Sequence, residues 1–282
     1  MSPSPLLVIG ATGKTGRRVT AQLQQRGLAV RAVSRKSEVP FDWDDATTWR
    51  RAVEGVRAVY VVHAGLGTTE ASDQVGEFAK VAAAAGVTKA VLASTPDDGS
   101  AFSQSMRAAE RHILDAGLGL TSLRLRWFFQ NFSEDFLLPS VLSGELRLPA
   151  GDGKEAFVDA QDIAEVAAAA LTDDRHNGKC YDLTGPRTLS FAEVAREISR
   201  GAGHPVSYVA VEPDVFVAEQ IAMGVPAQWA DTFSHLYQDI AQEKLDLVSN
   251  DIEAVLGKPP RDFADFVASV AQDGTWRAHS AH

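Results

Sequence analysis

The chain has 282 residues, which is long enough for one large α/β domain with an appended lobe. Its composition, 45% hydrophobic and 23% charged, is usual for a globular protein. Its net charge of −10 argues against non-specific nucleic-acid binding. No apolar run reaches the roughly 18 residues of a membrane span, and the first residues lack the basic and apolar regions of a secretory signal. We therefore expect a cytoplasmic protein that binds neither nucleic acid nor membrane.

Metal and thiol chemistry are restricted by the single cysteine, Cys180. One cysteine allows no intrachain disulfide and no cysteine-only metal site, and we predict no metal centre. Because apolar residues flank Cys180, we expect a packed core thiol rather than a nucleophile. The tail 275–282 carries two histidines without partner ligands and is expected to be frayed.

The segment 6–16, LLVIGATGKTG, is the first motif. Residues 6–9 have the length of a buried parallel strand, and a helical pattern follows the three glycines. A strand, a glycine turn and a helix in this order predict a dinucleotide site. Gly10 would permit the tight turn, Gly13 would let the backbone approach a pyrophosphate, and Gly16 would allow close packing of the helix on the strand. The start of the helix would supply N–H groups to the phosphates.

Two other interpretations of this segment are a tight turn without a ligand and a P-loop. The P-loop requires glycine at the position of Val8, so that interpretation fails. The spacing of the glycines resembles the extended or atypical branch of the short-chain dehydrogenase/reductase superfamily. The expected cofactor contacts in this turn are Gly10, Thr12, Gly13, Lys14, Thr15 and Gly16.

Residues 30–34 read as the second strand and lead into Ser34, Arg35 and Lys36. The position after this strand faces the adenosine ribose in a dinucleotide fold. An acidic residue there suits the 2′-hydroxyl of NAD, whereas cations suit the 2′-phosphate of NADP. Since no acid precedes Glu38, we expect NADP(H), unless the two cations are merely solvated loop charges.

Several loops after expected strands add candidate residues. His63 follows the strand 56–62, where it could face the cofactor and act chemically. Ser94 and Thr95 end the strand 89–94, and such hydroxyls in short-chain reductases can polarise a carbonyl or lie against the nicotinamide. The resemblance also makes Asp42 a candidate adenine contact, although capping is an equal alternative; Asp45 is expected to cap a short helix.

The helix expected at 103–114 lacks the usual catalytic pair. Short-chain reductases place a tyrosine and a lysine at i and i+4 of this helix, so that both side chains share one face. Here Ser103 and Arg107 occupy that spacing. Arg107 could still hold a ribose or a phosphate, whereas Ser103 is a poor proton donor.

The combination of motifs along residues 5–210 resembles the NmrA-like branch of the atypical short-chain reductases. The matching residues are Gly10-Ala-Thr-Gly-Lys-Thr-Gly16, Ala109-Glu110…Leu114, Gly117-Leu118…Thr121…Leu123-Arg124…Phe128…Asn131, Phe157-Val-Asp159…Asp162-Ile163-Ala164, and Tyr181-Asp-Leu-Thr-Gly185 with Leu189-Ser190. The segment 41–49 resembles the ergot-alkaloid reductase subgroup, which includes festuclavine and agroclavine dehydrogenases. The pair Asp159 and Asp162 is expected to be structural, with Asp162 capping its helix.

This resemblance implies NADPH-dependent reduction of iminium or activated alkene bonds, and the branch also contains quinone reductases and silent redox sensors. The C-terminal lobe of the family closes over the substrate. Its expected substrate contacts are Phe128, Asn131, Trp229 and Phe233, with core packing as the alternative for each. His235 and Tyr237 are further proton donors in the helical stretch 213–248.

We expect a Rossmann-like, doubly wound parallel sheet with a smaller, mostly helical C-terminal substrate lobe. Residues 1–150, with segments from 156–185, would form the NADP(H)-binding core, and residues 186–282 the lobe. The predicted function is NADPH-dependent reduction of a small, apolar, unsaturated acceptor by a monomer or homodimer, with Ser94, Arg107 and His63 as candidate catalytic residues. The alternatives are a non-catalytic NADP(H) sensor that signals to a protein partner, and a cofactor-independent isomerase or cyclase.

Overall fold

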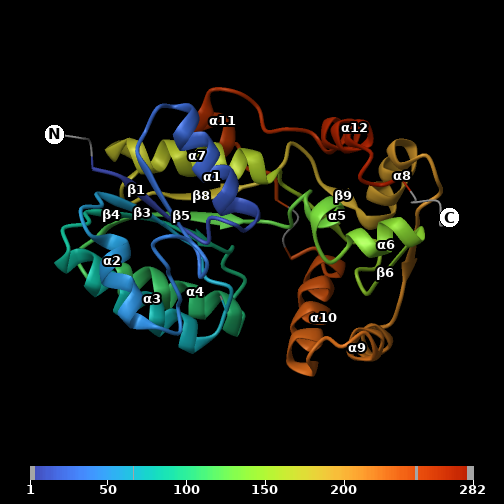
Figure 1. Ribbon diagram of the computed structural model, residues 1–282. Coiled ribbons are helices and arrows are strands. Elements are labelled where there is room, and N and C mark those ends of the chain that lie inside the picture. The colour runs from blue at the N-terminus through green and yellow to red at the C-terminus, as the bar shows by residue number, and fades with distance from the viewer. Residues whose placement is uncertain (1–3, 66, 245–246, 278–282) are drawn as a thin grey trace. The chain divides into compact units, whose positions relative to one another are not determined.

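The computed structural model describes residues 4–65, 67–244 and 247–277 (Figure 1). The chain divides into two compact units, each made of three segments. Unit 1 comprises Met1–Leu125, Ala160–Leu183 and Asn250–Pro259, and unit 2 comprises Arg126–Asp159, Thr184–Ser249 and Pro260–His282. The domain boundary expected at residue 150 therefore falls inside unit 2.

A six-stranded parallel sheet forms the centre of unit 1, in the order β2-β1-β3-β4-β5-β8. Its strands are β1 Leu6–Ile9, β2 Val30–Val33, β3 Ala58–Val61, β4 Lys89–Ser94, β5 Gly119–Leu125 and β8 Cys180–Leu183. β1, β3 and β4 are buried along their whole length, as continuous apolar runs predict for strands covered on both faces. The Rossmann-like fold expected from the sequence is confirmed.

Helices cover both faces of this sheet (Figure 1). α1 Lys14–Gln25 and α11 Asp251–Leu256 pack against α7 Ala160–Thr172, while α2 Trp49–Val53 and α4 Ala101–Asp115 pack against α3 Thr69–Ala84. Two short 3-10 turns, η1 Ala46–Thr48 and η2 Asp174–His176, complete unit 1. As expected, Asp45 caps η1, since its carboxylate accepts the Thr47 N–H at 3.0 Å.

The strand order of unit 1 reverses at β1, because β2 lies on one side of it and β3 on the other. In open parallel sheets, ligands bind outside the carboxyl ends of the strands at this switch point. The turn after β1 starts with Gly10, whose φ of +66° disfavours any residue with a Cβ atom. A Cβ on Gly10 would also lie 2.8 Å from Cγ1 of Val62, which follows β3. The switch point therefore brings the glycine turn close to the loop after β3.

Unit 2 combines helices with two small sheets. β6 Glu145–Leu148 pairs with β10 Ser207–Ala210 in parallel, and β7 Lys154–Glu155 pairs with β9 Leu189–Ser190 in antiparallel fashion. Its helices are α5 Asn131–Glu134, α6 Leu138–Ser143, α8 Phe191–Ala202, α9 Pro213–Ala222, α10 Ala227–Ala241 and α12 Phe263–Asp273. Their core is rich in aromatic rings, including Phe129, Phe132, Phe157, Phe191 and Phe263.

The helical stretch expected at 213–248 is interrupted. α9 ends before Gly224, whose φ is +90°, and α10 begins after Pro226. A left-handed glycine ends a helix, and the residue before a proline is disfavoured in helical geometry. Both residues are visible in the sequence, and they mark the break between the two helices.

Three further expectations need correction. Cys180 is exposed rather than packed in the core, because it begins β8 at the open edge of the sheet. Asp162 lies in the first turn of α7, which begins at Ala160, and so does not occupy the capping position before the helix. Trp276 in the expected frayed tail is only 1% exposed, and its indole Nε1–H donates to the Phe132 carbonyl at 2.8 Å. The histidines of the tail lie outside the described residues.

Candidate functional site

The start of α1 lacks a side-chain cap. Gly13 occupies the capping position, and among the described residues it makes no side-chain capping bond. Thr68, Ser100 and Ser190 provide such a bond for α3, α4 and α8. An uncapped helix start has free N–H groups and the positive end of the helix dipole, and both favour an anion.

Gly13 and Gly16 differ in whether the packing of the turn leaves room for a Cβ atom. A Cβ on Gly16 would lie 2.2 Å from the Gly10 carbonyl oxygen, a distance that no side chain tolerates. A Cβ on Gly13 would meet only that same oxygen at 3.3 Å, and the backbone of Gly13 is extended, with φ at −80°. The packing of the turn therefore explains Gly16, whereas the absence of a side chain at Gly13 leaves room for a ligand. Beside them Thr12 is exposed and Thr15 is buried.

The loop after β2 presents two cations to solvent. Arg35 and Lys36 are exposed, and within the described residues neither side chain has an ion-pair partner. Ser34 shapes the loop, because its N–H donates to Ser37 Oγ at 2.9 Å and its own hydroxyl oxygen accepts the Lys36 N–H at 3.4 Å. This loop leaves both cations available for a phosphate.

Asp42 has a local structural role in unit 1. Its Oδ1 accepts the Asp44 N–H at 3.2 Å, and its carbonyl accepts the Trp49 indole N–H at 2.7 Å. These bonds shape the turn before α2. An adenine contact by Asp42 would come in addition to them and stays a prediction.

Both ring nitrogens of His63 have partners. The Gly65 N–H donates to Nδ1 at 2.9 Å, so the proton of the neutral ring sits on Nε2, which donates to Gln74 Oε1 at 2.8 Å. The imidazole also packs against the Trp43 ring, with 4.6 Å between the centroids. Burial lowers the pKa of His63 below its usual value of 6.5. The ring is therefore held neutral with its only proton already donated, which suits a structural role in the loop after β3.

A polar cluster lies between the end of β4 and α4. Arg107 Nη2 donates to Ser94 Oγ at 2.6 Å and to the Thr95 carbonyl at 2.9 Å, and it lies 2.8 Å from Glu110 Oε1. The same Glu110 oxygen accepts from the Ser94 and Ser122 hydroxyls at 2.8 and 2.7 Å. The cluster thus gathers two predicted residues, Ser94 and Arg107, around one carboxylate.

Among the described residues, three polar atoms of Arg107 and Thr95 are buried without a hydrogen-bond partner: Nε and Nη1 of Arg107, and the Thr95 hydroxyl oxygen. Buried polar atoms without partners are rare and costly, so each calls for an explanation. A bound oxygen-rich ligand would provide acceptors for the two guanidinium nitrogens and for the threonine hydroxyl.

Sequence reasoning missed the central member of the cluster, Glu110. Its signal was present, because Glu110 follows Arg107 by three residues and the two side chains therefore share a face of α4. Ser103, where the sequence analysis expects the usual catalytic tyrosine, is 1% exposed, and its hydroxyl donates to the Ser100 carbonyl at the start of its own helix.

In unit 2, two of the four predicted substrate contacts form part of the local structure. Phe128 forms a bridge with Val158, and Asn131, which is 6% exposed, begins α5. On α10, Phe233 and Trp229 are half-buried, and the Phe233 ring stacks on Phe136 at 5.6 Å. Phe136 in turn packs against Trp127. These aromatic side chains form a surface that sequence reasoning identified only in part.

The second pair of candidate proton donors lies on α10. Tyr237 is 1% exposed, its hydroxyl has no hydrogen-bond partner among the residues described, and burial raises its pKa well above 10.0. His235 is exposed, and its Nδ1 contacts the Asp231 carbonyl oxygen at 2.7 Å. Neither geometry singles out a proton donor.

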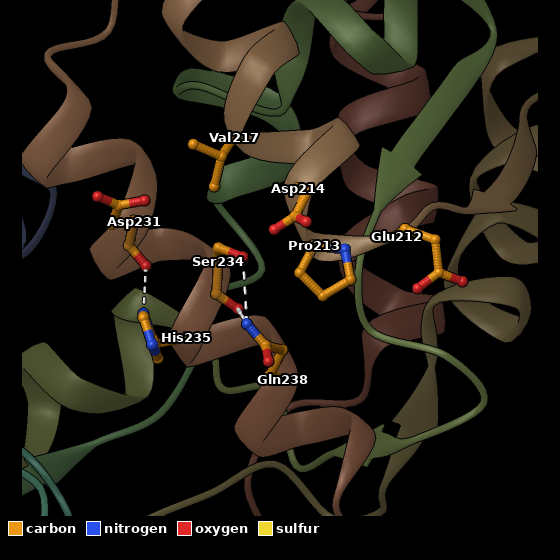
Figure 2. A pocket seen from close by; sticks show the side chains of 8 residues that line it. All are labelled: Glu212, Pro213, Asp214, Val217, Asp231, Ser234, His235 and Gln238. Carbon is orange, nitrogen blue, oxygen red and sulfur yellow. Dashed lines mark hydrogen bonds between the residues drawn. The ribbon is translucent and has the colours of Figure 1, made fainter.

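A cavity of about 410 Å³ lies within unit 2, between α9 and α10. Figure 2 shows its lining, in which three carboxylates accompany a few apolar and polar groups: Glu212, Pro213, Asp214, Val217, Asp231, Ser234, His235 and Gln238. Ser234 and Gln238 are hydrogen-bonded to each other at 3.2 Å. Nowhere in the described chain do three or more acidic, histidine or cysteine side chains form a group that could hold a metal. No helix in the described part of the chain is long and apolar enough to span a membrane.

Sequence comparison finds oxidoreductases that match this chain over most of its length. An uncharacterized oxidoreductase of Bacillus subtilis, YesF, is 32% identical, with 96% of each chain covered. An NAD(P)H azoreductase of Xenophilus azovorans is 31% identical, with 94% of this chain and 98% of the relative covered. Agroclavine dehydrogenase of Claviceps fusiformis is 30% identical over 93% and 96%. The expected similarity to clavine dehydrogenases is thereby confirmed.

Solved structures share the fold. An NADPH-dependent quinone oxidoreductase of Escherichia coli matches with a TM-score of 0.82, 23% identity and 94% and 99% of the two chains covered. NmrA, a negative transcriptional regulator solved with NAD, matches with a TM-score of 0.73, 17% identity and 97% of each chain covered. The family model of the NmrA-like family matches residues 3–267. The chain therefore belongs to the NmrA-like family.

Proposed function

We propose that this chain is an NADPH-dependent reductase that transfers a hydride to a small unsaturated acceptor: an iminium ion, a quinone or an enone. The oxidoreductases among its relatives support the general activity. The observation that carries the cofactor is the turn after β1, where α1 starts without a side-chain cap and Gly13 leaves space that no part of the turn fills.

The charges beside this turn favour NADPH over NADH. Arg35 and Lys36 follow β2 and remain exposed without an ion-pair partner in the described part of the chain. A 2′-phosphate would gain charge-assisted hydrogen bonds from both cations, whereas a 2′-hydroxyl would meet no carboxylate there. Ser34 and Asp42 would lie against the adenosine portion.

The unpartnered donors of unit 1 fit the nicotinamide end of the cofactor. Across residues 4–65, 67–244 and 247–277, two buried nitrogens of Arg107 and the Thr95 hydroxyl have no hydrogen-bond partner. Ribose and carboxamide oxygens would satisfy them. NADPH, when bound, supplies the hydride, and the residues of this chain bind the cofactor, orient it and exclude water.

The missing tyrosine–lysine pair favours acceptors that need little acid catalysis. Reduction of an iminium carbon yields a neutral amine without a proton from the protein, whereas a quinone or enone takes one proton in addition to the hydride. In unit 2, Phe128, Asn131, Trp229 and Phe233 are our proposed acceptor contacts.

Calorimetric titration with NADP⁺, NADPH, NAD⁺ and NADH tests the cofactor assignment. We expect NADPH to bind more tightly than NADH. The loss of NADPH absorbance with a panel of iminium ions, quinones and enones then tests the reaction. Binding of no dinucleotide would refute the proposal.

A second candidate is a non-catalytic sensor that reports the redox state of NADP(H) to a protein partner. The specific observation in its favour is that Ser103, which replaces the usual tyrosine, is buried and bonded within its own helix. A sensor should distinguish oxidised from reduced cofactor in affinity and should oxidise NADPH with none of the acceptors. Turnover of any acceptor decides in favour of the reductase.

A further inference from the structure

One carboxylate oxygen of Glu110 lies within hydrogen-bond distance of three side chains, and this arrangement determines which group donates in each bond. Its Oε1 lies within 2.8 Å of Ser94 Oγ, Ser122 Oγ and Arg107 Nη2. An ionised carboxylate accepts hydrogen bonds and donates none. Both serine hydroxyls must therefore donate their single proton to Glu110.

Ser94 has no second proton for a substrate. A guanidinium donates and never accepts, so Ser94 Oγ accepts from Arg107 Nη2 at 2.6 Å while it donates to Glu110. Although Ser94 stands at the end of β4, where a reductase can place a catalytic hydroxyl, its proton is held by the carboxylate. Ser94 is a spacer between Arg107 and Glu110 rather than an acid.

Arg107 is held by one of its nitrogens. Nη2 contacts Ser94, Glu110 and the Thr95 carbonyl, whereas Nε and Nη1 are buried and have no partner in the part of the chain that the structure describes. The guanidinium is planar, so anchoring one nitrogen determines where the others point. The side chains of Arg107 and Glu110 are each only 15% exposed, which keeps the anchoring ion pair largely out of water.

We propose that Glu110 is the positioning residue of this site. It holds Arg107 through Nη2 and thereby directs Nε and Nη1 toward the oxygens of the bound dinucleotide. This inference rests on the proposed function, because it takes the dinucleotide as the ligand. It assigns the ligand contact to two atoms of Arg107, and it removes Ser94 from the candidate proton donors.

A double-mutant cycle tests the coupling between the two residues. In the otherwise wild-type protein, which keeps Arg107, Glu110→Gln preserves the size of the side chain and removes its charge. This change should raise the dissociation constant for NADPH at least about tenfold. In an Arg107→Met background the same change should alter it less than about twofold, since no guanidinium is left to position. A merely structural role of Glu110 would weaken binding equally in both backgrounds, and that result would overturn the inference.

A matched control comes from α3 in the same unit. Glu77 and Lys80 also form an ion pair three residues apart, at 2.6 Å, but on the exposed surface. Glu77→Gln should leave NADPH binding unchanged. Each variant is compared by circular dichroism and thermal unfolding, so that a loss of fold is recognised.

Arg107→Lys provides a second test should Glu110→Gln fail to fold. Lysine keeps the positive charge and one nitrogen that can contact Glu110, but it has no counterpart of Nε and Nη1 that could donate to the dinucleotide. Weakening of NADPH binding by about tenfold or more supports the inference, and unchanged binding overturns it. If the wild-type protein binds no dinucleotide, the proposed function and this inference fail together. If it binds NADPH and the cycle is additive, only the inference fails.

Discussion

Replacing Gly13 and Gly16 by alanine should separate ligand binding from stability within one turn. At Gly16 the new Cβ would lie 2.2 Å from the Gly10 carbonyl oxygen and 2.7 Å from its carbon, both of them backbone atoms. Neither atom can move without opening the turn. We expect Gly16→Ala to lower the free energy of unfolding by more than about 3 kcal/mol, in the range of severe overpacking.

At Gly13 the same added methyl should act on the ligand. The backbone there is extended, with φ −80° and ψ 174°, and alanine adopts this conformation readily. The unfolded chain loses freedom, which stabilises the protein by about 0.4–1 kcal/mol, and the 3.3 Å contact with the Gly10 carbonyl offsets part of this gain. The net change in stability should stay within about 1 kcal/mol. A pyrophosphate seated on the turn would meet the methyl group, and binding should weaken at least about tenfold, or about 1.4 kcal/mol.

The assay measures both quantities on each variant: the unfolding midpoint in urea and the NADPH dissociation constant by calorimetry. The expected pattern is a stable Gly13→Ala protein with weak NADPH binding and an unstable Gly16→Ala protein. A stable Gly13→Ala protein that binds NADPH like the wild type would refute the idea that position 13 faces the pyrophosphate.

Three other predictions concern Arg35 in cofactor binding, His63 in the pH dependence of stability, and Trp276 in the packing of the C-terminal segment. Arg35→Ala should weaken NADPH about 10- to 100-fold and NADH less than about twofold in calorimetry, because only NADPH offers a phosphate to the cation. For His63, whose folded-state pKa lies below 6.5, the unfolded chain takes up a proton first as the pH falls. The free energy of unfolding should therefore fall below pH 6.5 by up to about 1.4 kcal/mol per pH unit, and His63→Gln should flatten the profile measured by urea unfolding. Trp276→Phe should lower the free energy of unfolding by about 1–3 kcal/mol, because the buried Phe132 carbonyl loses its donor.

Each of these has a matched control. Arg50 is an exposed arginine in the same unit, and Arg50→Ala should leave both dinucleotides unaffected. For His63, the control is the same His63→Gln variant above about pH 7.5, where the ring is neutral in the folded and unfolded chains and the two profiles should be equally steep. Trp229 is only half-buried, so Trp229→Phe should cost less than Trp276→Phe. Equal effects in test and control variants would contradict the respective argument.

The sequence predicted the parts of the fold that depend on local pattern. Apolar runs identified the buried strands. The glycine turn predicted the end of the first strand and the start of the first helix to within about two residues. Cys180 was misjudged, because apolar neighbours indicate a strand but not whether it lies at the edge of a sheet. Likewise Trp276 carried no periodic signal, since its burial depends on Phe132, which lies 144 residues away in the chain.

The candidate site could be predicted one residue at a time but not as an arrangement. The positions of Ser94 and Arg107 at the end of a strand and on the following helix were readable from the sequence. The spacing of three residues also places Glu110 beside Arg107 on α4, but the bonds from Ser94 and Ser122 to Glu110 follow from the packing of α4 on the sheet, which the sequence does not show. For His63, neither the partner Gln74 nor the bond from Gly65 could be read from a lone histidine.

The interleaving of the two units has a consequence for biosynthesis. The chain passes from one unit to the other after residues 125, 159, 183, 249 and 259. The last strand of the six-stranded sheet is at 180–183, and α11, which packs on α7, is not made until residue 256. As the protein leaves the ribosome, the edge strand β8 must wait for its contacts with α11, among them the bond from the Asp182 N–H to Asp251 Oδ2, while residues 184–249 of unit 2 are translated. Such a nascent chain is exposed to mispairing at that edge, and we expect its yield to depend on chaperones more than its final stability would suggest.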